Sequence, residues 1–272
     1  MKIGIVGLLV LGSLSCANES PIPQAEHGPE KIMEVKELKA SEADSLFELV
    51  LGNHGGSKYD SAHFSFIFRK TEYTFENQGS DYFYSRKFVK AGDSIFDFMS
   101  PNSFSREVNW QFLELAEKEL IKYRSSLNSV IYFATLPHKL GDASVHKKIV
   151  GEDSVNGLSY ILMEVGFEKT GGGEDFDDEY LYWINSESLT MDYFAYNYQV
   201  NGGGVRFRSS FNRRKVDGIL FQDYINFEAP IGTPLKDLAN MMENGDLKEL
   251  SRILTEDVKS IKENQKASPI KK

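Results

Sequence analysis

The chain has 272 residues, of which 41% are hydrophobic and 12% aromatic, and its formal net charge at pH 7 is −9. This length and apolar content are enough for one large β-rich domain, or two small ones, with a hydrophobic core. The acidic balance and the lack of a basic stripe exclude general nucleic-acid binding, which needs Lys and Arg to neutralise phosphates.

The N-terminal residues predict an exported protein. Lys2 precedes an apolar run over residues 3–11, and small residues then lead to Cys16, the only cysteine of the chain. This order is typical of a signal peptide, and the apolar run is too short to span a membrane. The sequence Ser13-Leu14-Ser15-Cys16 resembles a bacterial lipobox, with Ser13 where Leu is usual.

We therefore expect a signal peptide over residues 1–15 and acylation of Cys16. An exported chain with a lone cysteine would otherwise carry a free thiol. Several acyl chains on one residue would anchor the protein firmly, since each buried CH₂ contributes about 0.8 kcal/mol. The alternative is a plain signal peptide followed by an incidental cysteine.

The rest of the chain divides into a tether, a domain and a tail. Residues 16–30 contain three prolines among polar residues, which is typical of a flexible linker between a lipid anchor and a domain. We expect a single folded domain over residues 31–262. Residues 263–272 are polar, and we expect them to fray.

The domain is expected to begin with a helix over residues 31–51. Ser41 is a candidate N-cap with Asp44 three residues later, and the glycines after His54 are expected to end the helix. His54 can be read as a ligand, but a single histidine at a helix end is more often a cap or a surface residue. Alternating apolar residues then predict strands over residues 61–70, 72–77, 81–89 and 93–99.

Two helices are expected in the middle of the chain, over residues 109–123 and 127–136. The second run is apolar on all sides and contains Tyr132 and Phe133. Such a pattern is typical of a helix that is buried or faces a cavity. Pro137 is expected to end it.

Aromatic and β-branched runs dominate the second half of the chain. They predict strands over residues 147–155, 158–169, 180–185, 189–200, 205–211 and 219–227. Turns are expected at Asn156-Gly157, Asn201-Gly202 and Asp217-Gly218, because two-residue hairpin turns favour residues that tolerate positive φ. A final helix is expected over residues 235–261, with a break near Asn244-Gly245.

These elements predict an α+β fold with an antiparallel sheet, since strands come in runs and helices are segregated from them. The strand–helix alternation of a Rossmann fold or a TIM barrel is absent from the pattern. Both faces of the strands between residues 180 and 227 carry aromatic side chains. A sheet with one solvent face is more polar on that face, so we expect both faces to be covered.

Several segments resemble a family of exported proteins of Bacteroidetes-type bacteria. They are the helix end His54-Gly-Gly56, the segment Tyr132-Phe-Ala134 and, most specifically, the block over residues 192–224 with Asn201-Gly-Gly-Gly204 and Arg206-Phe-Arg208. Over most of the mature chain the sequence resembles the uncharacterised lipoprotein family DUF6503. The resemblance implies an architecture similar to that of LolA and LolB: a curved antiparallel half-barrel with helices packed in its concave side.

Catalytic and metal-binding motifs are weak in this sequence. The acidic residues 174–179 lack the spacing of an EF-hand, and the glycines at 171–173 lack the Lys-Ser/Thr of a phosphate loop, so both are interpreted as turns. The five histidines have no metal-ligand spacing, and we expect neither a metal site nor a cofactor. No Gly-x-Ser-x-Gly nucleophile elbow is present and no catalytic residue can be named, so an enzyme is not favoured.

The leading hypothesis is a protein that binds an apolar or amphiphilic ligand, such as a lipid, between the sheet and the helices. Arg206 and Arg208 lie on one face of a strand and would clamp an anionic head group. The alternative for these arginines is a solvent face with ion pairs to Asp192 and Glu179. The expected ligand-binding residues are Phe64, Phe66, Phe68, Tyr132, Phe133, Phe194, Tyr196, Arg206 and Arg208.

Two other functions stay open at this point. One is a periplasmic hydrolase or lyase that acts on a small substrate, and the other is a structural or interaction module without a ligand. We expect a monomer in the bacterial cell envelope, in the outer membrane, attached through acyl chains on Cys16 and without a nucleic-acid partner.

Overall fold

The computed structural model describes residues 41–168, 178–199 and 202–261. The expected signal peptide, Cys16, the tether, the polar tail, the glycines at 171–173, most of the acidic run at 174–179 and Asn201 lie outside the described residues. Within the described residues the protein is a mixed α+β fold with antiparallel sheets, as the strand runs predict. The strands form two sheets rather than the single sheet that was expected.

The first sheet has seven strands in the order β14-β1-β2-β3-β4-β5-β6, and every neighbouring pair is antiparallel. Along β1, Phe64 and Phe66 are buried while Ser65 and Ile67 are more exposed, which confirms the alternation seen in the sequence. The strands are β1 (His63–Phe68), β2 (Thr71–Gln78), β3 (Asp81–Lys90), β4 (Asp93–Ser100), β5 (Ser103–Val108), β6 (Gln111–Leu113) and β14 (Glu256–Ser260).

The second sheet also has seven antiparallel strands, in the order β13-β12-β11-β10-β9-β8-β7. Its hairpins turn at Asn156-Gly157 and Asp217-Gly218, where all four residues have positive φ as expected. The strands are β7 (Val145–Val155), β8 (Leu158–Phe167), β9 (Tyr180–Asn185), β10 (Met191–Tyr198), β11 (Gly204–Val216), β12 (Ile219–Ala229) and β13 (Lys248–Ile253).

The first helix, α1 (Glu42–His54), begins at the expected cap. Ser41 Oγ accepts a hydrogen bond from the Asp44 backbone N–H at 3.1 Å, and acidic residues occupy the first turn, where they complement the helix dipole. The helix ends at Gly55, whose φ of 143° is accessible to glycine. A short 3₁₀ segment, η1 (Gly56–Ser61), leads into β1.

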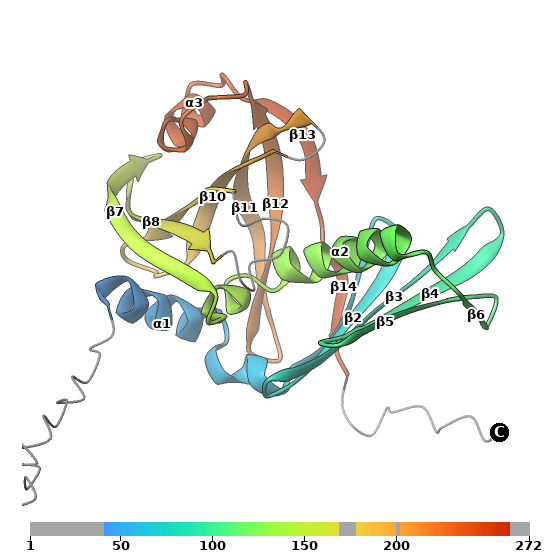
Figure 1. Ribbon diagram of the computed structural model, residues 1–272. Helices are drawn as coiled ribbons and strands as arrows, with labels where there is room; N and C mark the ends of the chain where they lie inside the picture. Colours follow the sequence, from blue (N-terminus) through green and yellow to red (C-terminus); the bar gives the residue numbers. More distant parts are fainter. Residues whose placement is uncertain (1–40, 169–177, 200–201, 262–272) are drawn as a thin grey trace, which may run out of the picture. The chain divides into compact units, whose positions relative to one another are not determined.

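A single long helix, α2 (Glu117–Ala134), replaces the two helices expected over residues 109–123 and 127–136. Asn109 and Trp110 have φ of 50° and 67° and form a hairpin turn between β5 and β6, so the first part of the expected helix is strand. Its apolar residues Phe112 and Leu113 lie exposed on β6, at the edge of the first sheet. The helix packs on the first sheet and contacts β3, β4 and β5 (Figure 1).

The helix expected over residues 235–261 is also wrong. The segment contains a 3₁₀ turn, η5 (Leu235–Asp237), the short helix α3 (Leu238–Glu243), and the strands β13 and β14. Gly245, with a φ of 77°, lies just after α3. β13 pairs with β12 at the edge of the second sheet, and β14 pairs with β1 at the edge of the first sheet. This strand pairing overrides the local helical pattern of the sequence.

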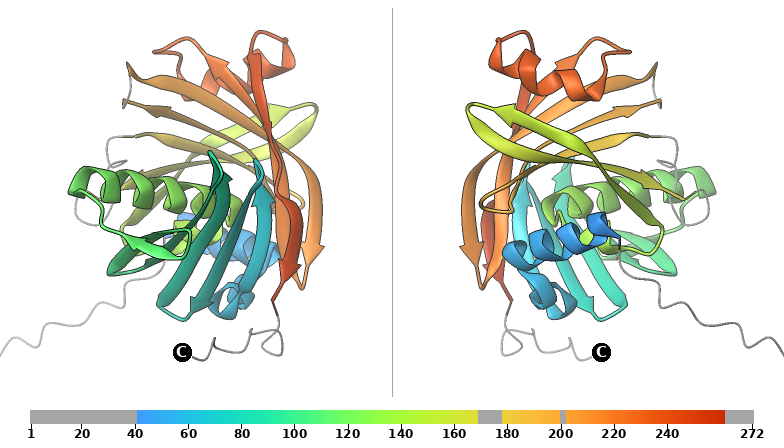
Figure 2. Two further views of the ribbon diagram at one scale, coloured as in Figure 1. Left: turned by 90° about the vertical axis from the view of Figure 1, so that its right-hand side faces the viewer. Right: turned by 90° about the vertical axis from the view of Figure 1, so that its left-hand side faces the viewer.

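The chain passes from one sheet to the other at Leu254-Thr255, between β13 and β14 (Figure 2). Thr255 is fixed there by buried Asp223 of β12, whose Oδ1 accepts hydrogen bonds from the Thr255 backbone N–H and from Oγ1, both at 2.9 Å. Arg214 donates to the same carboxylate and to Thr255. This short, polar link is therefore one of the connections between the sheets, and α2 forms another between β6 and β7.

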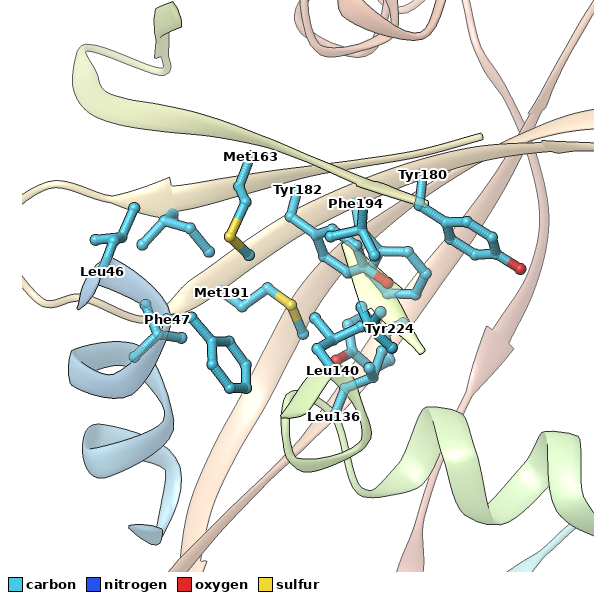
Figure 3. Packing of buried hydrophobic residues seen from close by; sticks show 14 residues of the cluster. Leu46, Phe47, Leu136, Leu140, Met163, Tyr180, Tyr182, Met191, Phe194 and Tyr224 are labelled. Carbon is cyan, nitrogen blue, oxygen red and sulfur yellow. The ribbon is translucent and has the colours of Figure 1, made fainter. Parts of the chain in front are cut away.

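Buried apolar residues form three clusters. One joins α1, the segment after α2 and one face of the second sheet; Figure 3 shows Leu46 and Phe47 of α1 near Leu136, Leu140 and the rings of Tyr182 and Phe194. Another joins Leu127 and Ile131 of α2 to the rings of the first sheet. The third packs Leu238 and Ala239 of α3 against the opposite face of the second sheet, so both faces of that sheet are covered.

Candidate functional site

A cavity of about 260 Å³ lies where α2 meets strands of both sheets. The lining comes from the C-terminal half of β1 and from the last two turns of α2. One to three further residues come from each of β10, β11, β12 and β13. Exposed Ser129 of α2 and exposed Arg69 at the end of β1 mark where the cavity meets solvent. Its lining consists of Phe66, Phe68, Arg69, Ser129, Val130, Phe133, Ala134, Tyr196, Arg208, Gln222, Tyr224, Asn226, Ile253 and Thr255.

Aromatic rings make up the apolar wall of the cavity. Phe133 of α2 stacks on Phe194 and on Tyr196 of β10, with ring centroids 5.8 and 5.9 Å apart. On the other side Phe66 of β1 stacks on Tyr73, with centroids 5.5 Å apart. These offset stacks fix the rings in place, so the wall is ordered without a ligand.

Arg208 of β11 provides the charged part of the lining. Its side chain is 92% buried, since only 8% of its surface is exposed. Its guanidinium lies over the rings of Phe133, Phe194 and Tyr196, at 4.2, 5.2 and 5.3 Å from their centroids. Nη2 donates a hydrogen bond to Tyr196 Oη at 2.9 Å, whereas Nε is buried and has no hydrogen-bond partner among the described residues.

Two buried phenols near Arg208, those of Tyr182 and Tyr224, are neutral at physiological pH. Burial raises the pKa of Tyr224 to about 12, although Gln222 and Arg208 act in the opposite direction. Burial also raises the pKa of Tyr182 well above its ordinary value. The phenols therefore act as hydrogen-bonding groups and supply no negative charge to the arginine.

Five of the nine ligand-binding residues expected from the sequence line this cavity: Phe66, Phe68, Phe133, Tyr196 and Arg208. Phe194 lies immediately behind Phe133 and is fully buried. Tyr132 meets Phe133 edge to face but is not part of the lining. Phe64 lies in the core of the first sheet between Phe75 and Phe221, with centroid distances of 5.6 and 5.4 Å.

Arg206 is separated from Arg208 although both lie on the same face of β11. Its Nη2 donates to Tyr198 Oη at 2.7 Å, and Glu228 of β12 is its partner in the strand register. The pKa of Glu228 is lowered, first by the hydrogen bond from Lys248 and also by the charge of Arg206. Arg206 thus has polar neighbours outside the cavity, but they are Tyr198 and Glu228 rather than the Asp192 and Glu179 of the ion-pair alternative.

Other candidate residues have structural partners. Asp192 accepts hydrogen bonds from Arg213, from Thr190 Oγ1 at 2.6 Å and from Tyr160 Oη at 3.2 Å. His54 is fully buried rather than on the surface, and its Nε2 accepts a hydrogen bond from the Met191 backbone N–H at 3.2 Å. Neither Asp192 nor His54 lines the cavity.

The described parts of the chain contain neither a cluster of metal ligands nor a membrane-spanning helix. No group of three or more His, Cys, Asp or Glu residues there is placed to hold a metal ion. None of the helices in these parts is long and apolar enough to cross a membrane.

The model of DUF6503, a family of unknown function, matches residues 14–255. The chain belongs to DUF6503. This confirms the resemblance that was carried mainly by the block over residues 192–224, which supplies Tyr196, Arg208, Gln222 and Tyr224 to the cavity. No curated protein gives a significant match.

Among solved structures, this DUF6503 member is similar to a LolA superfamily protein from Nitrosomonas europaea, with 11% sequence identity and a TM-score of 0.47. It is also similar to a DUF1329 family protein from Desulfovibrio piger, with 12% identity and a TM-score of 0.45. Each comparison covers 81% of this chain and 94% of the other chain.

Sequence reasoning missed several lining residues of the DUF6503 chain. Gln222, Tyr224 and Asn226 alternate along β12, and the period-two pattern would have placed them on one face. Ile253 and Thr255 were assigned to a helix, so nothing in their expected geometry pointed to a cavity.

Proposed function

We propose that the protein binds the apolar chain of an amphiphilic ligand in the cavity beneath α2. The main support is a cavity of about 260 Å³ whose apolar wall consists largely of stacked aromatic rings. An apolar chain that packs against these rings would remove its surface from water, which favours binding.

The composition of the lining supports binding over catalysis. The cavity is lined by apolar and aromatic side chains with a few polar groups, which is typical of small-molecule binding sites. The lining residues include no carboxylate, imidazole or thiol. Such groups are the usual general bases and the usual activators of hydroxyl nucleophiles, so the lining gives the hydrolase or lyase alternative little support.

The architecture that we propose is a curved half-barrel, with α2 in its hollow side as the cover of the ligand. We further propose that the domain is held in the bacterial cell envelope, at the outer membrane, by acyl chains on Cys16. The signal-peptide and lipobox pattern of residues 1–16 supports this part. A lipid-anchored domain of this kind would present its cavity to amphiphiles of the nearby bilayer.

The binding proposal is tested with N-phenyl-1-naphthylamine, a neutral probe that fluoresces in apolar surroundings. Ser129→Trp places an indole where the cavity meets solvent, at an exposed position that tolerates a large side chain. Ser125→Trp is the matched control, because Ser125 is also exposed on α2 and is not part of the lining.

The wild type and Ser125→Trp should bind the probe with equal affinity, and Ser129→Trp should weaken binding by about tenfold or more, the effect of roughly 1.4 kcal/mol. Thermal melting of all three proteins checks that the fold is retained. Equal affinities for the two tryptophan variants, or no probe fluorescence with the wild type, would contradict ligand binding in this cavity.

A further inference from the structure

We propose that the ligand carries an acidic group and that Arg208 binds it inside the cavity. This inference rests on the proposed function and specifies the class of ligand: a small single-chain amphiphile with a carboxylate or phosphate head. The observation behind it is a buried guanidinium without an anion to pair with.

Arg208 has no carboxylate within ion-pair distance among the described residues. Other buried arginines of this protein do have one: Arg86 and Arg106 both pair with Asp97. The Cα partners of Arg208 in the neighbouring strands are Phe194 and Asn226, which carry no charge. The charge of Arg208 is therefore unbalanced locally.

An unpaired charge is costly to bury, and arginine cannot escape the cost by losing its proton. Three ring faces around the guanidinium offset part of this cost through cation–π contacts, and Tyr196 accepts one hydrogen bond. The Nε–H group still has no acceptor among the described residues. An oxyanion in the cavity would supply the missing charge, because Arg208 is part of the lining and guanidinium forms strong charge-assisted hydrogen bonds with oxyanions.

A second unpaired polar atom lies beside Arg208. Asn226, opposite Arg208 in the β11–β12 register, also lines the cavity, and its Oδ1 is buried without a hydrogen-bond partner among the described residues. Buried polar atoms in folded proteins are nearly always bonded. Arg208 and Asn226 on neighbouring strands therefore define the polar end of the cavity.

The size of the cavity limits the apolar part of the ligand. About 260 Å³ lies below the range of roughly 300–1,000 Å³ that is usual for ligand pockets. This volume favours one short alkyl chain over a lipid with several long chains. The rings of Phe66, Phe68 and Phe133 would contact that chain.

The test compares three probes with matched chains: decanoate, decyl phosphate and decanol. Each is titrated at neutral pH against protein loaded with N-phenyl-1-naphthylamine, and the concentration that displaces the fluorophore is measured. Arg208→Met removes the charge and keeps the length of the side chain. Arg206→Met is the matched control, since Arg206 lies on the same strand face but outside the cavity.

With the wild type, at least one of the two acidic probes should displace the fluorophore at about tenfold lower concentration than decanol, as expected for a charge-assisted hydrogen bond. Whichever acid is stronger identifies the head group. Arg208→Met should abolish the preference for the acidic probe and leave the concentration of decanol that displaces the fluorophore unchanged. Arg206→Met should keep the preference.

An equal response of the wild type to decanol and to both acids would overturn the anionic ligand while leaving apolar binding intact. Loss of the preference in Arg206→Met but not in Arg208→Met would also overturn it. If none of the three probes displaces the fluorophore, the cavity does not bind amphiphiles and both proposals fail. If Arg208→Met no longer melts cooperatively, the comparison of the acidic probes with decanol in the wild type still tests whether the ligand is anionic.

Discussion

His54 shows how one buried side chain makes the stability of this fold depend on pH. It closes α1 and accepts the Met191 backbone N–H at Nε2, which links the helix to β10. Burial is the main cause that lowers its pKa from 6.5 to about 4, and the nearby charges of Arg213 and Lys215 act in the same direction. The imidazole is therefore neutral in the folded protein at physiological pH.

A sharp loss of stability is expected between pH 6.5 and 4. In this window the unfolded chain binds a proton at His54 and the folded chain does not, so the free energy of unfolding falls as the pH falls; His54 alone accounts for about 3 kcal/mol. His54→Asn keeps a hydrogen-bond acceptor and should remove this part of the slope. Denaturant unfolding at several pH values measures the slope, with His146→Asn as control because the His146 side chain is 65% exposed. Identical slopes for wild type and His54→Asn would refute this assignment.

Helix α2 is attached to the first sheet by a buried ionic group as well as by apolar packing. Asp97 of β4 is fully buried and pairs with Arg86 of β3 at 2.6 Å and with Arg106 of β5 at 2.7 Å. Arg86 also donates to Ser126 Oγ at 2.9 Å, and the Arg106 guanidinium lies 3.4 Å from the centroid of the Tyr123 ring. The helix that covers the cavity thus depends on three strands for its position.

Asp97→Asn should lower the free energy of unfolding by roughly 3–5 kcal/mol, because it leaves two buried guanidinium groups without their carboxylate. Asp93→Asn on the same strand is the control; Asp93 is exposed, and its loss should change stability by less than about 1 kcal/mol. Urea unfolding followed by circular dichroism gives both values. Equal effects of the two substitutions would show that the buried group does not hold α2.

Elements with strong local signals could be predicted from the sequence, and elements that depend on distant partners could not. Asn156-Gly157 and Asp217-Gly218 specify hairpins through their own positive φ, and Ser41 specifies a helix start through its own hydroxyl. By contrast, β13 and β14 exist because β12 and β1 offer open edges. The paired residues are 20 or more positions apart for β13 and about 190 for β14. A helix-like spacing of leucines over residues 235–261 carries no information about those edges.

At the scale of the whole molecule, the site lies where separate elements of the fold meet. Phe66 from β1, Phe133 from α2 and Arg208 from β11 come together where α2 meets strands of both sheets. The sequence indicated rings on one face and arginines on another, which were enough to nominate five lining residues. It could not distinguish Arg208 from Arg206, because alternation places both on the same face and only the tertiary packing separates them.

The central claim is that this cavity binds a chain with an acidic head, and a crystal structure of the protein with decanoate tests it most directly. We predict that the carboxylate lies within ion-pair distance of the Arg208 guanidinium and that the alkyl chain fills the space between Phe66 and Phe133. Decanoate bound elsewhere on the protein, or a cavity that stays empty at saturating decanoate, would contradict the account.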